Sequence, residues 1–362
     1  MACVTGDQVQ GPITYAAAGV DVEAGDKAVE LMKESVRRAQ RPEVLGGLGG
    51  FAGLFDASVL ARMARPVLAT STDGVGTKVA IAQALDRHDT IGFDLVGMVV
   101  DDIVVCGAEP LFMTDYIATG KVVPERIAAI VSGIAAGCQQ AGCALLGGET
   151  AEHPGLMAPD EYDVAGAGTA VVEADALLGP DRVRQGDTVI AMASSGLHSN
   201  GYSLARKVFL DQWALEAGVA EFGRTLGEEL LEPTRIYTRD CLAVAADVHA
   251  YSHVTGGGLA ANLARVLPPD LHADIDRGTW TMPPVFQVLL ELGVERRDAE
   301  RTFNMGIGML AVVPDPQPVL ATLAHRDVPA WVCGEVRPRV STDRSDAQAK
   351  GGHGGSVSLI GN

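Results

Sequence analysis

Several stretches of this chain combine glycine with aspartate, lysine or histidine at spacings that suit phosphate and proton chemistry. The first is "TDGVGTK" at 72–78, in which Asp73 ends a short apolar run and is followed by Gly74, Gly76, Thr77 and Lys78. Glycines let backbone amides approach an anion, a lysine adds a point charge, and an aspartate can hold Mg²⁺ that bridges to phosphate. The stretch predicts a metal-assisted phosphate site. The alternative is a plain strand-to-helix turn capped by Asp73.

The spacing of this stretch excludes two common nucleotide loops. A P-loop needs a serine or threonine after its lysine, but Val79 follows Lys78, and no glycine lies five residues before Gly76. A dinucleotide fingerprint needs a third glycine, which Gly74-Val75-Gly76 lacks. The phosphate prediction therefore depends on the chemistry of the residues themselves.

Three aspartates stand in an apolar segment just downstream. Asp101 and Asp102 interrupt the run "LVGMVVDDIVVCGA" at 95–108, and Asp94 lies seven positions before Asp101. Seven positions are about two helical turns, which puts Asp94 and Asp101 on the same side of a helix. Because a buried carboxylate must be capped, paired or bound to metal, these residues and Asp73 predict one or two Mg²⁺ ions. The alternative is a salt-bridged or solvent-facing helix edge.

Two glycine-rich loops predict anion contacts by the backbone. Gly46, Gly47, Gly49 and Gly50 surround one leucine, which suits a phosphate cover or a hinged lid, with a flexible connector as the alternative. "TGGGL" at 255–259 leads into a helix expected near Ala260, and amides at a helix start bind phosphate or carboxylate. "GGET" at 147–150 and "NMGIG" at 304–308 are interpreted as turns at strand ends.

His198 lies in the polar loop "SSGLHSNGYS" at 194–203. An imidazole with a pKa near neutrality could pass a proton there or polarise a forming charge. The alternative is a loop histidine with no role in catalysis.

These residues must be positioned by a mixture of helices and strands. Apolar periodicity predicts helices and strands without strict βαβ alternation, which favours α+β layers. The turn-rich stretch 177–187 suggests a boundary between a first domain, 1–176, and a second, 177–340. The tail 341–362 is a glycine-rich loop that could end in a strand at 356–360. The helices are expected at 24–39, 75–86, 92–106 and 125–141, from about 202, from near Ala260, and at 284–292. The strands are expected at 66–72, 111–120, 162–173, 188–193 and 306–313.

Length and charge limit the classes of function. The 362 residues suffice for two full cores, with 47% hydrophobic and 20% charged residues. A net charge of −18 argues against nucleic-acid or anionic-membrane partners, which require a cationic face. No apolar run approaches about 18 residues, no secretory signal is evident, and the six cysteines form no CxxC pair. We therefore expect a cytoplasmic protein.

Taken together, the motifs resemble those of the phosphoribosylformylglycinamidine cyclo-ligase (aminoimidazole ribonucleotide synthetase) family. They occur in family order from about residue 14 to 337. The matching stretches are "YAAAGVDVEAGD" (15–26), "RPEVLGGLGGFAGLF" (41–55), "TDGVGTK" (72–78), "RHDTIGFDLVGMVVDDIVVCGAEPLF" (87–112), "GGETAEHPG" (147–155), "SSGLHSNGYSL" (194–204), "HVTGGGLAANLAR" (253–265) and "FNMGIGM" (303–309).

The resemblance implies an enzyme of purine biosynthesis. Formylglycinamidine ribonucleotide and ATP would give aminoimidazole ribonucleotide, ADP and phosphate through an iminophosphate. It also implies a two-domain α+β architecture and a homodimer whose first domains share a sheet. ATP and Mg²⁺ would be the cofactors.

The resemblance also distributes roles among the residues. It implies catalysis by His198, Lys33 and Asp102, and metal binding near Asp73 and Asp102, to which the spacing argument adds Asp94. ATP or phosphate contacts are expected at Gly46, Gly47, Gly49, Gly50, Gly74, Gly76, Thr77 and Lys78, and substrate contacts at Ser199, Asn200, Thr255, Gly256, Gly257 and Gly258.

Two departures and two rivals qualify this interpretation. Residues before 14 and beyond 340 match nothing in the family, and many members carry Asn where Asp101 stands, which favours Asp102 as the metal ligand. Another ATP-dependent phosphoryl-transfer enzyme of the same fold is one rival. A selenophosphate synthetase would need a reactive cysteine near the glycine loop, and this loop has none. The other rival is a non-catalytic nucleotide sensor, in which the charged loop residues should be eroded.

Overall fold

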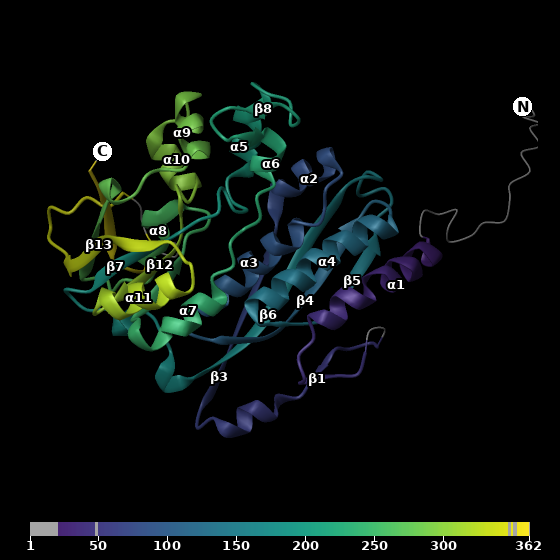
Figure 1. Ribbon diagram of the computed structural model, residues 1–362. Helices are drawn as coiled ribbons and strands as arrows, with labels where there is room; N and C mark the ends of the chain where they lie inside the picture. The colour runs from purple at the N-terminus through teal and green to yellow at the C-terminus, as the bar shows by residue number, and fades with distance from the viewer. Residues whose placement is uncertain (1–20, 48–49, 347–348, 350–352, 362) are drawn as a thin grey trace, which may run out of the picture.

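A computed structural model describes residues 21–47, 50–346, 349 and 353–361 in two layered α+β parts (Figure 1). The first part contains a four-stranded sheet in the order β3-β6-β4-β5. The second contains a six-stranded sheet in the order β10-β12-β7-β13-β11-β14. The predicted α+β class is confirmed.

The first part is built from helices on one face of its sheet. Figure 1 shows α1, α3 and α4 lying across that face. The helices are α1 (Val22–Arg38), α2 (Val79–Leu85), α3 (Ile91–Val104) and α4 (Pro124–Ala141). The strands are β3 (Pro66–Gly74), β4 (Glu109–Thr119), β5 (Ala144–Glu152) and β6 (Tyr162–Glu173), with a small hairpin of β1 (Val44–Leu45) and β2 (Leu54–Phe55).

α3 is the central helix of this part because it is apolar on nearly every side. A helix that is hydrophobic all round belongs in a core, and all but two of its fourteen residues are buried. It packs very closely on α4. A Cβ added to Gly92 would lie 1.9 Å from the Ile134 amide nitrogen, so only glycine permits this approach.

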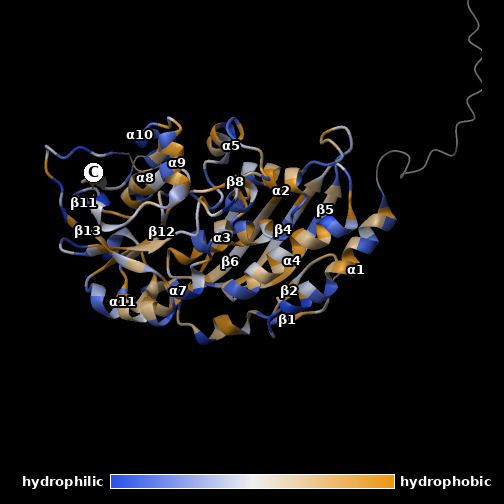
Figure 2. Cartoon of the chain, turned by 45° about the horizontal axis from the view of Figure 1, so that its top comes forward, coloured by the Kyte–Doolittle hydropathy of each residue, from blue (hydrophilic) through white to orange (hydrophobic). Residues whose placement is uncertain are grey.

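The four-stranded sheet has one helix-covered face and one open face. Side chains alternate along β3, and its odd-numbered residues from Val67 to Asp73 are more buried than their neighbours. Leu68 and Tyr116 lie on the opposite face and are 60% and 42% exposed. Figure 2 shows hydrophobic colour on the strands and on the helix faces turned toward them.

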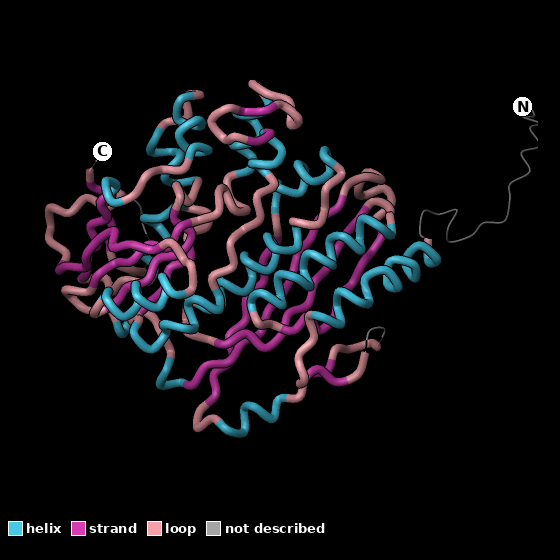
Figure 3. The backbone as a smooth tube through the Cα atoms, viewed as in Figure 1, coloured by secondary structure: helices cyan, strands magenta, loops and turns pink. Residues whose placement is uncertain are grey.

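The second part buries both faces of its sheet. β12 is apolar throughout and every residue in it is buried, as expected for a strand covered on two sides. α8 packs on one face, and α7 and α11 pack on the other. Figure 3 shows these strands enclosed by helices. The strands of this sheet are β7 (Thr188–Ala193), β10 (Ala250–His253), β11 (Leu271–Asp276), β12 (Ile307–Val313), β13 (Ala330–Pro338) and β14 (Ser356–Ile360). A separate two-stranded sheet consists of β8 (Gly218–Val219) and β9 (Arg224–Thr225).

Two sequence predictions can be compared with the elements of the second part and with the helices of the whole described chain. The strand expected at 356–360 is present as β14, which pairs parallel to β11. Within the described residues, no helix has the length and apolar character needed to cross a bilayer. The helices are α5 (Tyr202–Leu210), α6 (Leu226–Leu230), α7 (Thr238–Val244), α8 (Gly258–Arg265), α9 (Pro284–Glu291), α10 (Arg296–Thr302) and α11 (Pro316–His325).

One local prediction was wrong. "GGET" at 147–150 is not a turn but lies inside β5. The glycine is required by a neighbour on β4, because a Cβ on Gly148 would lie 2.4 Å from the Asp115 carboxylate. Gly148 therefore makes room for a buried carboxyl group.

Candidate active site

The first carboxylate of α3 is held in an ion pair, away from solvent. Asp94 is completely buried, and its Oδ1 lies 2.8 Å from Lys78 Nζ. The same oxygen accepts hydrogen bonds from the backbone N–H and the hydroxyl of Thr234, at 2.9 and 2.7 Å. Lys78 Nζ also donates to the carbonyls of His198 and Glu232, at 3.1 and 2.6 Å. The ammonium group thus connects the turn after β3 to the segments around His198 and Glu232 in the second part.

This geometry gives two predicted ligand residues a structural contact. Lys78 was expected to bind phosphate and Asp94 to bind metal, but each is fully buried and engaged with the other. Burial lowers the pKa of Lys78 and raises that of Asp94, and the partner's charge opposes the shift in both cases. The residues therefore fix the seam between the two parts. The sequence could not reveal this, because the carbonyl partners lie more than a hundred positions away.

The second carboxylate of α3 is also an anchor. Asp101 is buried and accepts hydrogen bonds from the Tyr237 amide, at 3.0 Å, and from the Thr238 hydroxyl, at 2.7 Å. Burial raises its pKa to about 6, against the opposing effects of nearby His253 and these hydrogen bonds. Both oxygens of Asp101 thus accept hydrogen bonds at the start of α7, which is a structural contact between α3 and α7.

The third carboxylate, Asp102, is the one that faces solvent. Its side chain is 41% exposed, and its Oδ1 lies 2.8 Å from His253 Nδ1 at the end of β10. Burial works to lower the pKa of His253, but the hydrogen bond to Asp102 and the charges of Asp102, Asp101 and Asp73 outweigh it and raise the pKa. Asp73 makes the smallest of these contributions, whereas Asp102 is in direct contact with the ring. Asp73 itself accepts the Gly74 amide at 2.7 Å.

The sequence interpretation missed His253 as a site residue. It stands two positions before Thr255, at the end of a strand in which every residue, His253 included, is buried. The sequence feature that could have indicated it is its position just before the glycine stretch Gly256–Gly258. Among the described residues, Asp73, Asp94 and Asp102 do not form a three-ligand metal cluster.

Residues predicted to contact substrate meet beside Asp102. Asn200 Nδ2 lies 3.7 Å from Met98 Sδ, and Met98 precedes Asp102 by one turn of α3. A Cβ on Gly256 would lie 3.4 Å from Asn200 Oδ1, so the two loops touch. Ser199 lies nearby, with its hydroxyl 3.3 Å from that of Thr234. The seam thus brings together polar groups from both parts of the chain.

The remaining glycines and hydroxyls of these loops are placed as follows. Thr255 O accepts the Gly258 amide at 3.1 Å, and Gly257 is the residue that precedes α8. Gly76 begins the short helical turn Gly76–Lys78, and Thr77 Oγ1 lies 3.3 Å from Ser203 Oγ. The turn at 76–78 therefore also lies against the second part.

His198 is arranged as a neutral hydrogen-bond donor. Its ring is only 1% exposed, and its backbone has φ = 60°, which is uncommon for a residue other than glycine. The Ser195 amide donates to Nε2 at 3.2 Å, so the proton of a neutral ring is on Nδ1. In the described part of the chain, Nδ1 is buried without a hydrogen-bond partner.

The expected near-neutral pKa of His198 is not what its surroundings favour. Burial first, and then the charges of His253, Lys78 and Arg235, hold its pKa well below the ordinary value. The ring is therefore uncharged at neutral pH, and its buried Nδ1–H is the group that it can offer. This suits stabilisation of a forming charge better than uptake of a proton.

A second group of predicted site residues lies around α1 of the first part, away from the contact with the second part. Lys33 on α1 forms an ion pair with Glu30 and borders a shallow depression together with Gly47. Gly50 borders a cavity of about 410 Å³ between α1 and β5, which Asp115 and Glu149 also line. Gly46 has φ = 85°, and Gly49 lies outside the described residues.

The sheet register relates this cavity to Asp73. Asp73 pairs with Gly166, Gly166 with Asp115, and Asp115 with Gly148, so the four form one row across the sheet. Three strand spacings separate the ends of the row, or about 14 Å. The cavity lining at Gly148 and the Asp73 position therefore lie on the same face of the sheet, three strands apart.

Asp115 makes stability depend on pH. Burial raises its pKa to about 7, whereas an aspartate in an unfolded chain titrates near 3.9. Between these values the unfolded chain loses a proton that the folded protein keeps. The free energy of unfolding should therefore fall as pH rises, by about 1.4 kcal/mol per pH unit from this group.

We expect Asp115→Asn to remove this slope and to be more stable than wild type at about pH 8. Urea denaturation at about pH 5 and about pH 8 measures the difference. The matched control is Asp163→Asn, at an exposed position on the neighbouring strand β6. An equal pH slope in Asp115→Asn and wild type would show that Asp115 is ionised in the folded protein.

The chain matches a known protein family over most of its length. Residues 55–172 match the family described as AIR synthase related protein, N-terminal domain, and residues 184–344 match the corresponding C-terminal domain. Phosphoribosylformylglycinamidine cyclo-ligase of Geobacillus kaustophilus is 52% identical over 329 residues, which are 89% of this chain and 95% of that protein. The enzyme of the same name from Anaeromyxobacter sp. strain Fw109-5 is 51% identical over 330 residues, with 90% and 96% covered.

Solved structures share the fold at low sequence identity. Thiamine-monophosphate kinase from Stenotrophomonas maltophilia superposes with a TM-score of 0.63 at 20% identity, covering 90% of this chain and 95% of that one. Hydrogenase maturation protein HypE in complex with ATP superposes with a TM-score of 0.63 at 18% identity, covering 96% and 97%. At these identities the likeness concerns the architecture alone.

Proposed function

Because this chain belongs to the phosphoribosylformylglycinamidine cyclo-ligase family, we propose that it closes the imidazole ring of formylglycinamidine ribonucleotide at the expense of ATP. The products are aminoimidazole ribonucleotide, ADP and phosphate, and the reaction belongs to purine biosynthesis. The identity of 52% over 89% of the chain supports this assignment and confirms the resemblance found in the motifs.

The reaction needs an activated oxygen. ATP transfers its γ-phosphoryl group to the formyl oxygen, which gives an iminophosphate and ADP. The amidine nitrogen then attacks the same carbon, so that a C–N bond forms, the C–O bond breaks and phosphate leaves. The attacking nitrogen also loses a proton. A site for this chemistry must offset charge on a moving phosphoryl group and orient two reacting groups.

One observation supports this function most strongly. Asp102, His253 and Asn200 lie at the seam where α3 of the first part meets β10 and the 194–203 loop of the second. Catalytic groups contributed by two parts of a chain favour a substrate bound between them. We propose that Ser199, Asn200 and residues 255–258 bind the ribonucleotide and that Asp102 and His253 face its reacting end.

Asp73 and Asp102 are the residues that we propose for Mg²⁺. They fit this ion in kind, because both are carboxylates, and the side chain of Asp102 is 41% exposed. Mg²⁺ commonly takes one or two carboxylates and completes its shell with water and substrate phosphates. The bound ion would offset negative charge on ATP. Asp94 is not part of this proposal, because its carboxylate is buried against Lys78.

We propose that His198 assists by donating from Nδ1. The partnerless Nδ1–H is a preorganised donor, and its low-dielectric surroundings make such a donor more effective. Lys33 and Gly46–Gly50 are proposed to cover the triphosphate, which is supported by the depression that Lys33 and Gly47 share. Gly74, Gly76 and Thr77 are proposed to contact phosphate through their backbone and hydroxyl groups.

The open face of the four-stranded sheet supports a homodimer. Leu68 and Tyr116 point away from the helices, and Leu54 of the small hairpin is also exposed. Large exposed apolar side chains on one sheet face are typical of a surface that another subunit covers. We propose that two first parts associate through this face.

Leu68→Asp is expected to weaken the dimer at least about tenfold, since burying an unpaired carboxylate costs more than the 1.4 kcal/mol that corresponds to a factor of ten. Sedimentation velocity across a concentration series measures the shift to monomer. Val340→Asp, at an apolar position that is similarly exposed in the second part, is the matched control. A wild-type monomer, or an unchanged dimer in Leu68→Asp, would refute this interface.

The state of the cysteine residues supports a proposal for the cellular compartment. The five cysteines in described segments are all unpaired with one another, and four of them are buried. Thiols of this kind suit a reducing environment, and we propose the cytoplasm, with small molecules rather than nucleic acid or membrane as partners.

The reaction itself is the test of the function. Purified protein with ATP, Mg²⁺ and formylglycinamidine ribonucleotide should produce aminoimidazole ribonucleotide and ADP in equal amounts. ADP should form only when the ribonucleotide is present. Phosphorylation of another small molecule in its place would favour the rival kinase-like enzyme. ATP binding without any turnover would favour the nucleotide sensor.

A further inference from the structure

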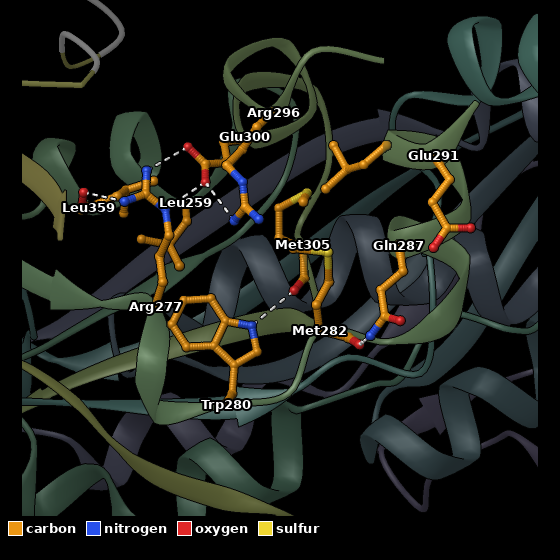
Figure 4. Close-up of a pocket in the computed structure, with 11 residues that line it drawn as sticks. Leu259, Arg277, Trp280, Met282, Gln287, Glu291, Arg296, Glu300, Met305 and Leu359 are labelled. Atoms are coloured by element: carbon orange, nitrogen blue, oxygen red, sulfur yellow. Dashed lines mark hydrogen bonds and ion pairs between the residues drawn. The ribbon is translucent and has the colours of Figure 1, made fainter. Parts of the chain in front are cut away.

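A second cavity of about 420 Å³ lies in the second part and shares no residue with the seam described above. Figure 4 shows its lining residues, which come from α8, α9, α10, β14 and the segments around 277–282 and 305. The apolar members are Leu259, Trp280, Met282, Leu290, Met305 and Leu359. The cavity is therefore a pocket that is open on one side, with six apolar lining residues that include one aromatic ring.

The aromatic wall is fixed in orientation. Trp280 Nε1 donates to the Met305 carbonyl at 3.1 Å, so the indole does not need a ligand to hold it. Met305 has φ = 52°, an uncommon backbone conformation for a residue with a side chain, and it is followed by Gly306 at φ = 103°. Such outliers persist where the surrounding structure holds them, and they concentrate at binding sites.

The charges around the cavity are balanced. Arg277 binds Glu300 through two hydrogen bonds of 2.7 and 2.9 Å, which neutralise both side chains. Arg296 and Glu291 at the rim carry one charge of each sign, and Arg296 lies 4.0 Å from Glu300. A polyanion such as a nucleoside triphosphate would meet two carboxylates here. The balance favours an uncharged ligand.

The polar edge of the cavity also limits the ligand. Gln287 Nε2 donates to the Met282 carbonyl at 2.5 Å, so its side chain offers the amide oxygen as an acceptor. Arg296 offers donors. A planar ring that carries both N–H donors and ring acceptors would match these groups while stacking on the indole.

We propose that this cavity binds a neutral, planar nitrogen heterocycle of nucleobase or nucleoside size, at a site separate from those proposed above for ATP and the ribonucleotide. Trp280 supplies the stacking face, the two methionines adapt to the edge of the ring, and Gln287 and Arg296 provide directional contacts.

Adenosine is the probe, and the fluorescence of Trp280 reports its arrival. The protein is first saturated with ATP and Mg²⁺, so that adenosine cannot act through the nucleotide site. We expect adenosine to quench the fluorescence saturably. Trp280→Leu should abolish the quenching, while Trp331→Phe, at another of the three tryptophans, should retain it.

A variant that keeps the reporter tests the site independently. Met282→Glu adds a charge to the apolar wall and should raise the apparent Kd for adenosine at least about tenfold, since burying a charge is costly. No quenching up to the solubility limit of adenosine would overturn the proposal. Equal affinity in Met282→Glu, or quenching that survives Trp280→Leu, would place the ligand elsewhere and also overturn it.

Discussion

Lys78→Met is expected to reduce the free energy of unfolding by about 3–5 kcal/mol, as is typical when one partner of a buried ion pair is removed. The ammonium group has three oxygen partners, and it lies 5.5 Å from the centre of the Tyr202 ring. Methionine fills similar space but leaves Asp94 as a buried carboxylate with only Thr234 beside it. The midpoint and slope of urea denaturation measure the loss.

The pH dependence of this loss has a definite sign. In Lys78→Met, burial raises the pKa of Asp94 without an opposing counterion, so the folded variant holds a proton that the unfolded chain has released. The deficit should therefore grow as pH rises above the ordinary aspartate range.

The matched control is the double variant Lys78→Met/Asp94→Asn. An amide at position 94 has no charge to bury and still offers an oxygen to Thr234, so most of the lost stability should return. If the single variant is as stable as wild type, the ion pair does not join the two parts, and Lys78 regains the phosphate role that the motif suggested.

His198→Asn is expected to lower kcat by about 10²–10³-fold, the usual effect of losing one preorganised donor at a site of forming charge. Asparagine is chosen because it tolerates the positive φ of this position better than most residues. The stability of the variant should therefore change little, and the defect should lie in the chemical step. Steady-state kinetics measure kcat, and calorimetry measures nucleotide binding.

The control for this variant is His325→Asn, on the exposed surface of α11. It should keep full activity. Parallel loss of ATP affinity and kcat in His198→Asn would move His198 into the ATP site. Normal kcat would show that the buried Nδ1–H does not contribute to the reaction.

The sequence predicted much of the fold because its elements have strong local patterns. α3 is a continuous apolar run, and α4 begins at Pro124 and ends at Gly142 with φ = 79°, which are common start and stop residues for helices. The predicted strands 162–173 and 188–193 have the observed bounds. β5 was missed because the glycines of "GGET" suggest a turn, and the contact of Gly148 with the Asp115 carboxylate on β4 is visible only in the structure.

The candidate site was harder to predict because its chemistry depends on distant partners. The metal role of Asp73 and Asp102 stays a prediction. Lys78 has the sequence context of a phosphate ligand, but it is buried by contacts with residues 120 and 154 positions away. His253 has no motif of its own and gains its importance only through Asp102.

The fate of one oxygen atom tests the central claim most directly. Formylglycinamidine ribonucleotide labelled with ¹⁸O in its formyl group is incubated with the protein, ATP and Mg²⁺, and the phosphate is analysed by mass spectrometry. Phosphorylation of the formyl oxygen predicts that each phosphate released carries one ¹⁸O, in step with the aminoimidazole ribonucleotide formed. Unlabelled phosphate alongside the ring-closed product would contradict the iminophosphate route, and absence of that product would contradict the assigned reaction itself.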